Sequence, residues 1–223
     1  MATARDPEGA GRRTSVRRRR VDPRRREELT EQVSDLVLAN GFSCLTMDDL
    51  SRQINCSKAT LYGVASSKEQ LVIRVTKRFF ARAAGEIEAA ASAESDPRQR
   101  IATYLTGVGV AMRRQSAAFY ADMVAYRPTA DIYEHNSSTA ARRLQELIES
   151  GAQQGVIRDV NGAFAAQLIR LAIDGIQSGA LLQATGLSAG DVFVELGDLL
   201  LNGLSSSNTS AERTPEAPRR RGT

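Results

Sequence analysis

A short polar segment near the N-terminus carries the side chains that commonly contact phosphates. Residues 55 to 68 have the sequence NCSKATLYGVASSK, in which lysines and hydroxyl-bearing residues alternate with small or apolar ones. We expect Lys58 and Lys68 to lie at helix N-termini, where free backbone N–H groups and the helix dipole already favour a phosphate. Thr60 and Tyr62 can point outward beside them. The segment is too short to be stable alone, so we expect neighbouring helices to support it and to present it to a partner.

Few residues in the chain could build a catalytic site. His135 is the only histidine, and there is no Gly-rich phosphate loop, no H-E-x-x-H motif and no G-x-S-x-G motif. Cys44 and Cys56 form no C-x-x-C pair, so we interpret both as structural thiols. Scattered carboxylates are interpreted as solvated or effector-contacting groups: Asp122, Asp131 and Asp174. We therefore expect no catalytic residue, metal site or cofactor, although an all-α enzyme or a helical scaffold protein stays open as the alternative.

Two long helices are predicted on either side of this segment. Asp22 and Pro23 can cap and start a helix over about residues 24 to 40, whose apolar residues recur at spacings of three and four. Ser67 begins an S-x-x-Q capping box that opens a second long helix, over residues 68 to about 93.

Two short helices are predicted between the long ones. Thr46 and Asp49 form a capping-box variant that starts a helix of about two turns, and Ser57 caps the next helix. The turn of residues 55 to 57 has the length found in a helix-turn-helix, whose second helix enters the major groove of DNA. Two residues of that second helix can face inward: Ala59 and Leu61. The same pattern also occurs in ordinary helical domains, so the spacing alone does not decide between the two.

A family resemblance favours the DNA-binding interpretation. The run LTMDDLSRQINCSKATLY at residues 45 to 62, followed by SSKEQL at residues 66 to 71, closely resembles the N-terminal domain of the TetR family of bacterial transcriptional regulators. The resemblance implies an all-α homodimer whose two heads bind a palindromic operator, and whose larger C-terminal domain binds a small effector. It also implies a DNA-facing set of residues: Thr46, Ser57, Lys58, Ala59, Thr60, Tyr62, Gly63 and Lys68.

One part of the motif departs from the family pattern. Where the family commonly has Tyr-x-His-Phe, this chain has Tyr62 followed by Gly63, Val64 and Ala65. A phosphate-contacting histidine and a large aromatic side chain are therefore missing. Gly63 also costs about 1 kcal/mol of helix propensity relative to alanine. We expect the end of this helix to be softened, and the arginines that precede the first helix to replace the lost phosphate contact.

Charge is distributed unevenly along the chain. Residues 1 to 26 carry ten arginines against three acidic residues, whereas residues 83 to 211 carry nine basic against 14 acidic residues. A basic arm before a mildly acidic body is expected of a protein that contacts a polyanion at one end. Solubilising disorder explains the arm equally well, so both interpretations stay open.

The central part of the chain is predicted to hold an effector pocket. Helices are expected from Pro97, over residues 119 to 126 and from Pro128 toward residue 151. Apolar and aromatic residues on them and on the following helix form the candidate pocket set: Met112, Phe119, Tyr120, Met123, Tyr126, Tyr133 and Phe164. Such residues at helical spacing are more often plain core, which is the alternative for each of them.

The last two predicted helices favour a dimer. They cover residues 160 to 184 and residues 189 to 204, and each is apolar over most of its circumference. Their own domain can cover one side, and a second copy the other, in a four-helix bundle. The candidate dimer set contains Phe164, Leu168, Leu171, Gly175, Ile176, Gly179, Leu182, Phe193, Leu196 and Leu200.

These patterns divide the chain into four parts: a disordered arm at 1–23, a DNA-binding domain at 24–84 with its helix-turn-helix at about 46–65, an effector-binding and dimerisation domain at 85–204, and a disordered tail at 205–223. No stretch is apolar for the roughly 20 residues of a membrane span. We therefore expect a cytoplasmic, ligand-responsive DNA-binding regulator, more often a repressor than an activator.

Overall fold

The computed structural model describes residues 22–156 and 161–204, and within these ranges the chain is entirely α-helical. The predicted all-α fold class is therefore confirmed. The N-terminal arm before residue 22 and the tail after residue 204 lie outside the described residues, as does the start of the helix predicted from residue 160.

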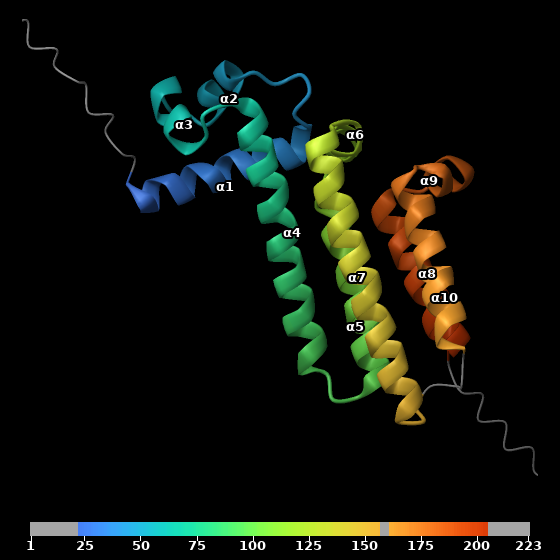
Figure 1. Ribbon diagram of the computed structural model, residues 1–223. Coiled ribbons are helices and arrows are strands. Elements are labelled where there is room, and N and C mark those ends of the chain that lie inside the picture. Colours follow the sequence, from blue (N-terminus) through green and yellow to red (C-terminus); the bar gives the residue numbers. More distant parts are fainter. Residues whose placement is uncertain (1–21, 157–160, 205–223) are drawn as a thin grey trace, which may run out of the picture.

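Four helices form the N-terminal head and its link to the rest of the chain. They are α1 (Pro23–Asn40), α2 (Met47–Gln53), α3 (Lys58–Val64) and α4 (Lys68–Ala93). Helices α2 and α3 lie on one side of α1, and α4 runs from the head deep into the body (Figure 1). These bounds agree with the predicted ones to within one or two residues, because the caps that define them are made by neighbouring side chains.

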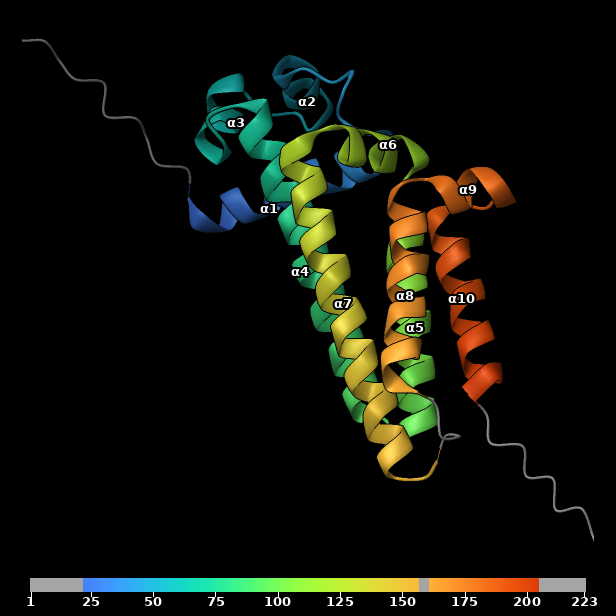
Figure 2. The same ribbon diagram turned by 45° about the vertical axis from the view of Figure 1, so that its right-hand side comes forward.

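Six further helices form the body. They are α5 (Pro97–Arg113), α6 (Ala117–Ala125), α7 (Arg127–Gln153), α8 (Gly162–Gln177), α9 (Ala180–Thr185) and α10 (Ala189–Leu204). Helices α5, α7, α8 and α10 run lengthwise, and the short helices α6 and α9 lie at the end of the body that is nearer the head (Figure 2). Helix α5 packs mainly against α10 and α4, and α7 packs against α8.

The helix predicted over residues 160 to 184 is wrong as a single element. The chain ends α8 at Gln177 and starts α9 at Ala180, and Gly179 between them has φ 75° and ψ −1°. This left-handed conformation is easy for glycine and costly for other residues. Gly179 therefore makes the turn between α8 and α9.

The Ser67 capping box forms only in part. The backbone N–H of Gln70 donates to Ser67 Oγ at 3.3 Å, as predicted. The Gln70 side chain instead accepts a hydrogen bond from Ser66 Oγ at 2.6 Å, so the reciprocal contact is replaced.

Head and body share one hydrophobic core. Phe42, in the turn after α1, lies edge-on to Phe119 of α6 and to Tyr126, with ring centroids 6.0 and 6.2 Å apart. Phe79 of α4 lies edge-on to Phe119 at 6.4 Å. Aromatic pairs of this geometry add about 0.5–1.5 kcal/mol beyond the burial of their area. The head is thus packed onto the body through α4 and α6 together.

None of the described helices is long and apolar enough to cross a membrane.

Candidate nucleic-acid interface

Helix α2 is fixed at its start by a complete capping box. The backbone N–H of Asp49 donates to Thr46 Oγ1 at 3.1 Å, and the backbone N–H of Thr46 donates back to Asp49 Oδ2 at 3.0 Å. The Thr46 hydroxyl also donates to the same carboxylate. The hydrogen bonds from Thr46, and to a smaller extent the charge of Arg52, hold the pKa of Asp49 below its usual range. Thr46 is therefore already engaged as a cap, although its side chain stays exposed at the head surface.

The turn from α2 into α3 is built by the backbone and by Ser57. Asn55 takes a left-handed conformation with φ 52°, which asparagine tolerates better than most residues. The backbone N–H of Cys56 then donates to the carbonyl of Ser51 at 2.9 Å. Ser57 Oγ accepts the backbone N–H of Thr60 at 3.1 Å and closes the first turn of α3. This geometry fixes how α3 projects from the head.

Helix α3 has a buried face and an exposed face. Leu61 and Val64 are fully buried against α1 and α2, whereas 46% of the surface of Tyr62 is exposed. Other members of the DNA-facing set are also accessible: Ser57, Lys58, Ala59 and Gly63 are exposed, and Thr60 is half-buried. The expectation that Ala59 faces inward is wrong, because Ala59 is exposed. Leu61 and Val64, which are three residues apart, form the buried face of this short helix.

Arg26 stabilises the end of α3 where the motif departs from the family pattern. Its guanidinium donates to the carbonyl oxygen of Val64, the last residue of α3, at 3.0 Å. Val64 and Ala65 are buried, so small apolar side chains occupy the position of the missing aromatic. Helix α3 continues through Gly63 to Val64, and the expected softening of its end is offset by this contact. Sequence reasoning missed Arg26 because its partner is 38 residues away.

An intramolecular counter-ion accompanies Lys58. Lys58 lies in the first turn of α3 and forms an ion pair with Asp48 of α2. Both side chains are about half exposed, so the pair contributes little to stability. A phosphate that approaches Lys58 must compete with this carboxylate.

Lys68 begins α4 as predicted, but its ammonium group bonds within the chain. Lys68 Nζ donates to the carbonyl oxygen of Ser43 at 3.0 Å, in the loop between α1 and α2. Lys68 therefore holds this loop against α4, and a phosphate contact by Lys68 would be an additional role.

Asp122 of α6 holds the same loop from the side of the body. Its Oδ2 accepts the backbone N–H groups of Phe42 at 2.5 Å and Ser43 at 2.7 Å. Burial raises the pKa of Asp122, but these hydrogen bonds and the charge of Lys68 outweigh it and leave the pKa below its usual range. A Cβ on Gly41 would lie 2.6 Å from Asp122 Oδ2, and Gly41 has φ 76°. Only glycine fits at this position without strain or collision.

Most of the candidate pocket set packs in the core of the chain. Phe119, Met123, Tyr133 and Met112 are buried core residues, and Tyr120 donates a hydrogen bond to the carbonyl of Ile176 at 2.8 Å. Phe164 is 69% exposed on α8 and is not part of this core. A pocket in the described part of the chain lies between α1, α4 and the end of α5, and none of the set lines it.

The candidate dimer set divides into two groups. Phe164, Leu168 and Leu171 are 69%, 47% and 55% exposed, and they follow one another along a single face of α8. The second group is buried or partly buried inside this chain: Ile176, Leu182, Phe193, Leu196 and Leu200. Among the α10 residues whose burial is described, Leu199 is a large apolar residue that is 72% exposed, and the set did not include it.

Comparisons with known proteins identify the fold. No family model and no curated protein sequence matches the chain. A transcriptional regulator from Saccharomonospora viridis, solved in complex with choline, has a TM-score of 0.65 at 18% identity over 83% of this chain and 100% of its own. A TetR transcription regulator from Haloarcula marismortui has a TM-score of 0.62 at 15% identity, over 81% of this chain and 100% of its own.

A third solved structure extends the comparison. The fatty acid degradation regulator FadR from Bacillus halodurans has a TM-score of 0.59 at 13% identity, over 82% of this chain and 97% of its own. Sequence identities this low establish the architecture and not the ligand or the DNA sequence. The chain accordingly has the TetR-type fold of bacterial transcriptional regulators, with an N-terminal helix-turn-helix and a helical C-terminal body.

Proposed function

We propose that this protein is a dimeric, ligand-responsive transcriptional regulator that binds a palindromic operator through α3 and releases it when a small effector binds. The observation that carries the proposal is the exposed face of α3. Lys58, Thr60 and Tyr62 project from a helix that is held rigidly by Ser57, Arg26 and a buried Leu61. Such a short, preorganised helix with hydroxyl and ammonium groups suits the major groove.

The head supplies the charge distribution that DNA binding requires. The arginine-rich arm precedes α1, and Arg24, Arg25 and Arg26 lie in the first turn of α1, where Arg26 contacts the end of α3 and the other two pair with Glu28. Arginines near a recognition helix can contact phosphates on either side of the major groove. We propose that the arm adds affinity that does not depend on DNA sequence, and that the exposed residues of α3 add specificity.

The exposed apolar face of α8 supports dimerisation. Phe164, Leu168 and Leu171 together with Leu199 of α10 leave large apolar side chains in water. Complete burial of such a side chain contributes about 1.5–3 kcal/mol. A second copy can cover them through the same face, because a two-fold interface brings identical surfaces together. Two heads placed by this dimer would match the two half-sites of a palindrome.

Two connections between body and head support the proposed response to an effector. Helix α4 begins beside α3 and ends in the body, and Asp122 of α6 holds the loop between α1 and α2. A ligand that shifts α4 or α6 would move the head, and it would weaken operator binding if the new head spacing no longer matches the half-sites.

A genomic DNA-binding screen tests the proposal. Purified protein is incubated with fragmented genomic DNA of its source organism, and retained fragments are sequenced and titrated by fluorescence anisotropy. We expect a small number of fragments that share an inverted repeat and bind at least about 1,000-fold more tightly than random DNA. The variant Tyr62→Ala should reduce this preference about tenfold.

An alternative class would give a different result in the same screen. An all-α enzyme or helical scaffold would retain no fragment above the level of random DNA, and Tyr62→Ala would leave that level unchanged. This outcome would refute the proposed function while leaving the fold assignment intact.

A further inference from the structure

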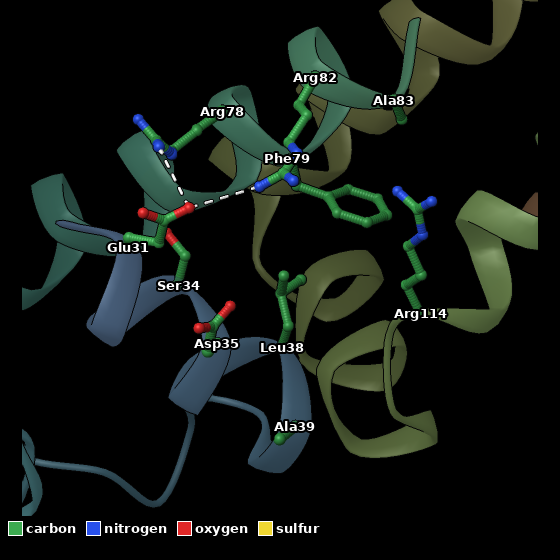
Figure 3. Close-up of a pocket in the computed structure, with 10 residues that line it drawn as sticks. All are labelled: Glu31, Ser34, Asp35, Leu38, Ala39, Arg78, Phe79, Arg82, Ala83 and Arg114. Carbon is green, nitrogen blue, oxygen red and sulfur yellow. Dashed lines mark hydrogen bonds and ion pairs between the residues drawn. The ribbon is translucent and has the colours of Figure 1, made fainter. Parts of the chain in front are cut away.

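A crevice lies between the head and the body. It has a volume of about 360 Å³ and is lined by residues of α1 and α4 and by Arg114 at the end of α5. Figure 3 shows these side chains directed toward a common space. The volume lies at the lower end of the range found for small-molecule sites.

The floor of the crevice is apolar. Leu38 and Ala39 of α1 face Phe79 and Ala83 of α4 across it. Phe79 and Ala83 are buried, whereas Leu38 is half-buried and Ala39 is exposed. A ligand that settles here can therefore cover the apolar surface that Leu38 and Ala39 still leave in contact with water.

The cations on the rim are mostly neutralised by carboxylates of this chain. Arg78 and Arg82 both form ion pairs with Glu31, and Arg82 Nε also contacts Glu86 at 2.8 Å. Arg114 shares that partner, since its Nη1 lies 2.5 Å from Glu86 Oε2. These pairs tie α1 to α4 and α4 to the end of α5. They also mean that the crevice is no simple anion site.

Two groups of opposite charge keep unused hydrogen-bonding capacity. Asp35 forms no hydrogen bond or ion pair with any residue in the described ranges, although its charge acts on the neighbouring Arg82, and both of its carboxylate oxygens are left as acceptors. Arg114 uses one terminal nitrogen for Glu86, and its Nε and Nη2 find no partner among the described side chains. In Figure 3 the two charged groups lie on either side of Leu38.

We infer that this crevice binds a small zwitterion, with an ammonium group on Asp35, a carboxylate on Arg114 and a short apolar chain over Leu38 and Phe79. Asp35 and Arg114 are both exposed, so a ligand with a single charge would leave one of the two groups to water, whereas a zwitterion can form charge-assisted hydrogen bonds with both. The ω-amino acids have the required arrangement. This site is distinct from a pocket inside the helical body, because its walls come from the head as well as from α4 and α5.

Calorimetric titration of the full-length protein with three ω-amino acids tests the inference without any DNA. The probes are γ-aminobutyrate, δ-aminovalerate and ε-aminocaproate, since the best chain length is set by the span between the two charges. We expect one of them to bind saturably, and its analogues without the amine or without the carboxylate to bind at least about tenfold more weakly. Amide chemical shifts should change around Asp35, Phe79 and Arg114.

Variants locate the site. Asp35→Asn and Arg114→Gln should each weaken binding about tenfold, while the matched exposed substitutions Glu134→Gln and Arg142→Gln on α7 should have no effect. Because Arg114→Gln also removes a contact to Glu86, Ala39→Leu provides a second test by filling the crevice with no change in charge. Absence of saturable binding by all three probes, equal binding by the single-charge analogues, or unchanged binding in Asp35→Asn and Ala39→Leu would overturn the inference. The result is independent of operator binding, so it does not depend on the proposed function.

Discussion

The N-terminal head and the α8–α10 end of the body differ in the kind of side chain that they expose. In the head, caps and loop contacts satisfy the polar groups, and the large apolar side chain left half-exposed is Tyr62. On the outer face of α8 and α10, Phe164, Leu168, Leu171 and Leu199 are all exposed. The head is therefore complete as a single copy and has a surface suited to a polar partner. The outer face of α8 and α10 has an apolar surface that a second copy would complete.

Removal of the exposed apolar side chains of α8 should have the largest effect. The double variant Phe164→Glu/Leu171→Glu places charges where the proposed interface buries two large side chains from each copy. Their loss costs at least about 3 kcal/mol, so the dimer dissociation constant should rise more than a hundredfold. Light scattering over a concentration series measures it, and circular dichroism should show unchanged helix content.

The matched control for this variant lies on the head. Tyr62→Glu exchanges another exposed aromatic side chain for a charge and should leave the dimer intact. A monomeric wild-type protein at micromolar concentration, or a double variant that dimerises normally, would contradict the comparison between the two regions.

Deletion of the arginine arm should change the salt dependence of DNA binding. Removal of residues 1 to 20 takes away seven arginines. Each phosphate contact contributes a slope of about −0.9 in log affinity against log salt, so the slope should flatten by about two units or more. Operator and random DNA should lose affinity alike. A full slope in the truncated protein would mean that the arm is solubilising disorder, and a changed sequence preference would mean that it contacts bases or the minor groove.

Tyr62→Ala should weaken operator binding about tenfold and leave the thermal midpoint of unfolding within about 1 °C, because the side chain is exposed and outside the core. Tyr62→Phe removes only the hydroxyl, so it distinguishes the contribution of the hydroxyl to operator binding from that of the ring. Lys68→Ala makes a useful contrast, since loss of its bond to the Ser43 carbonyl should lower both stability and affinity. Wild-type affinity in both alanine variants would mean that α3 does not contact DNA.

The smallest effect concerns the contact between Asp122 and the head. Asp122→Asn keeps an acceptor oxygen but removes the charge, and should destabilise the protein by about 1 kcal/mol at pH 7. The pKa of Asp122 lies below its usual range, so the folded state favours the ionised carboxylate. This stabilisation is present above the unfolded pKa of about 3.9 and is lost as the pH falls through the folded pKa.

Urea unfolding of both proteins measures this difference as a function of pH. The difference in the free energy of unfolding between wild type and Asp122→Asn should be constant near neutral pH and should shrink below about pH 4. Asp131→Asn, which removes an exposed pairing with Arg127 on α7, should change stability by less than about 0.5 kcal/mol. A difference in unfolding free energy that does not change with pH would show that Asp122 stabilises the protein through the geometry of its hydrogen bonds and not through its charge.

The sequence by itself determined most of the helices and several of the residues that start them. Thr46, Ser57 and Ser67 cap helices as predicted, because a cap involves side chains and backbone groups within three residues of each other. The same local signals, together with the motif at residues 45 to 71, were sufficient to predict the TetR-type fold.

Tertiary structure decided which faces of these helices are covered. Local patterns could not separate exposed Phe164 from buried Ile176, nor predict that Asp122 reaches a loop 80 residues away and that Arg26 reaches the end of α3. The helix break at Gly179 was missed for the same reason, since glycine permits a turn without requiring one. Capping energies depend on adjacent residues, whereas burial and long-range hydrogen bonds depend on where the whole chain places each helix.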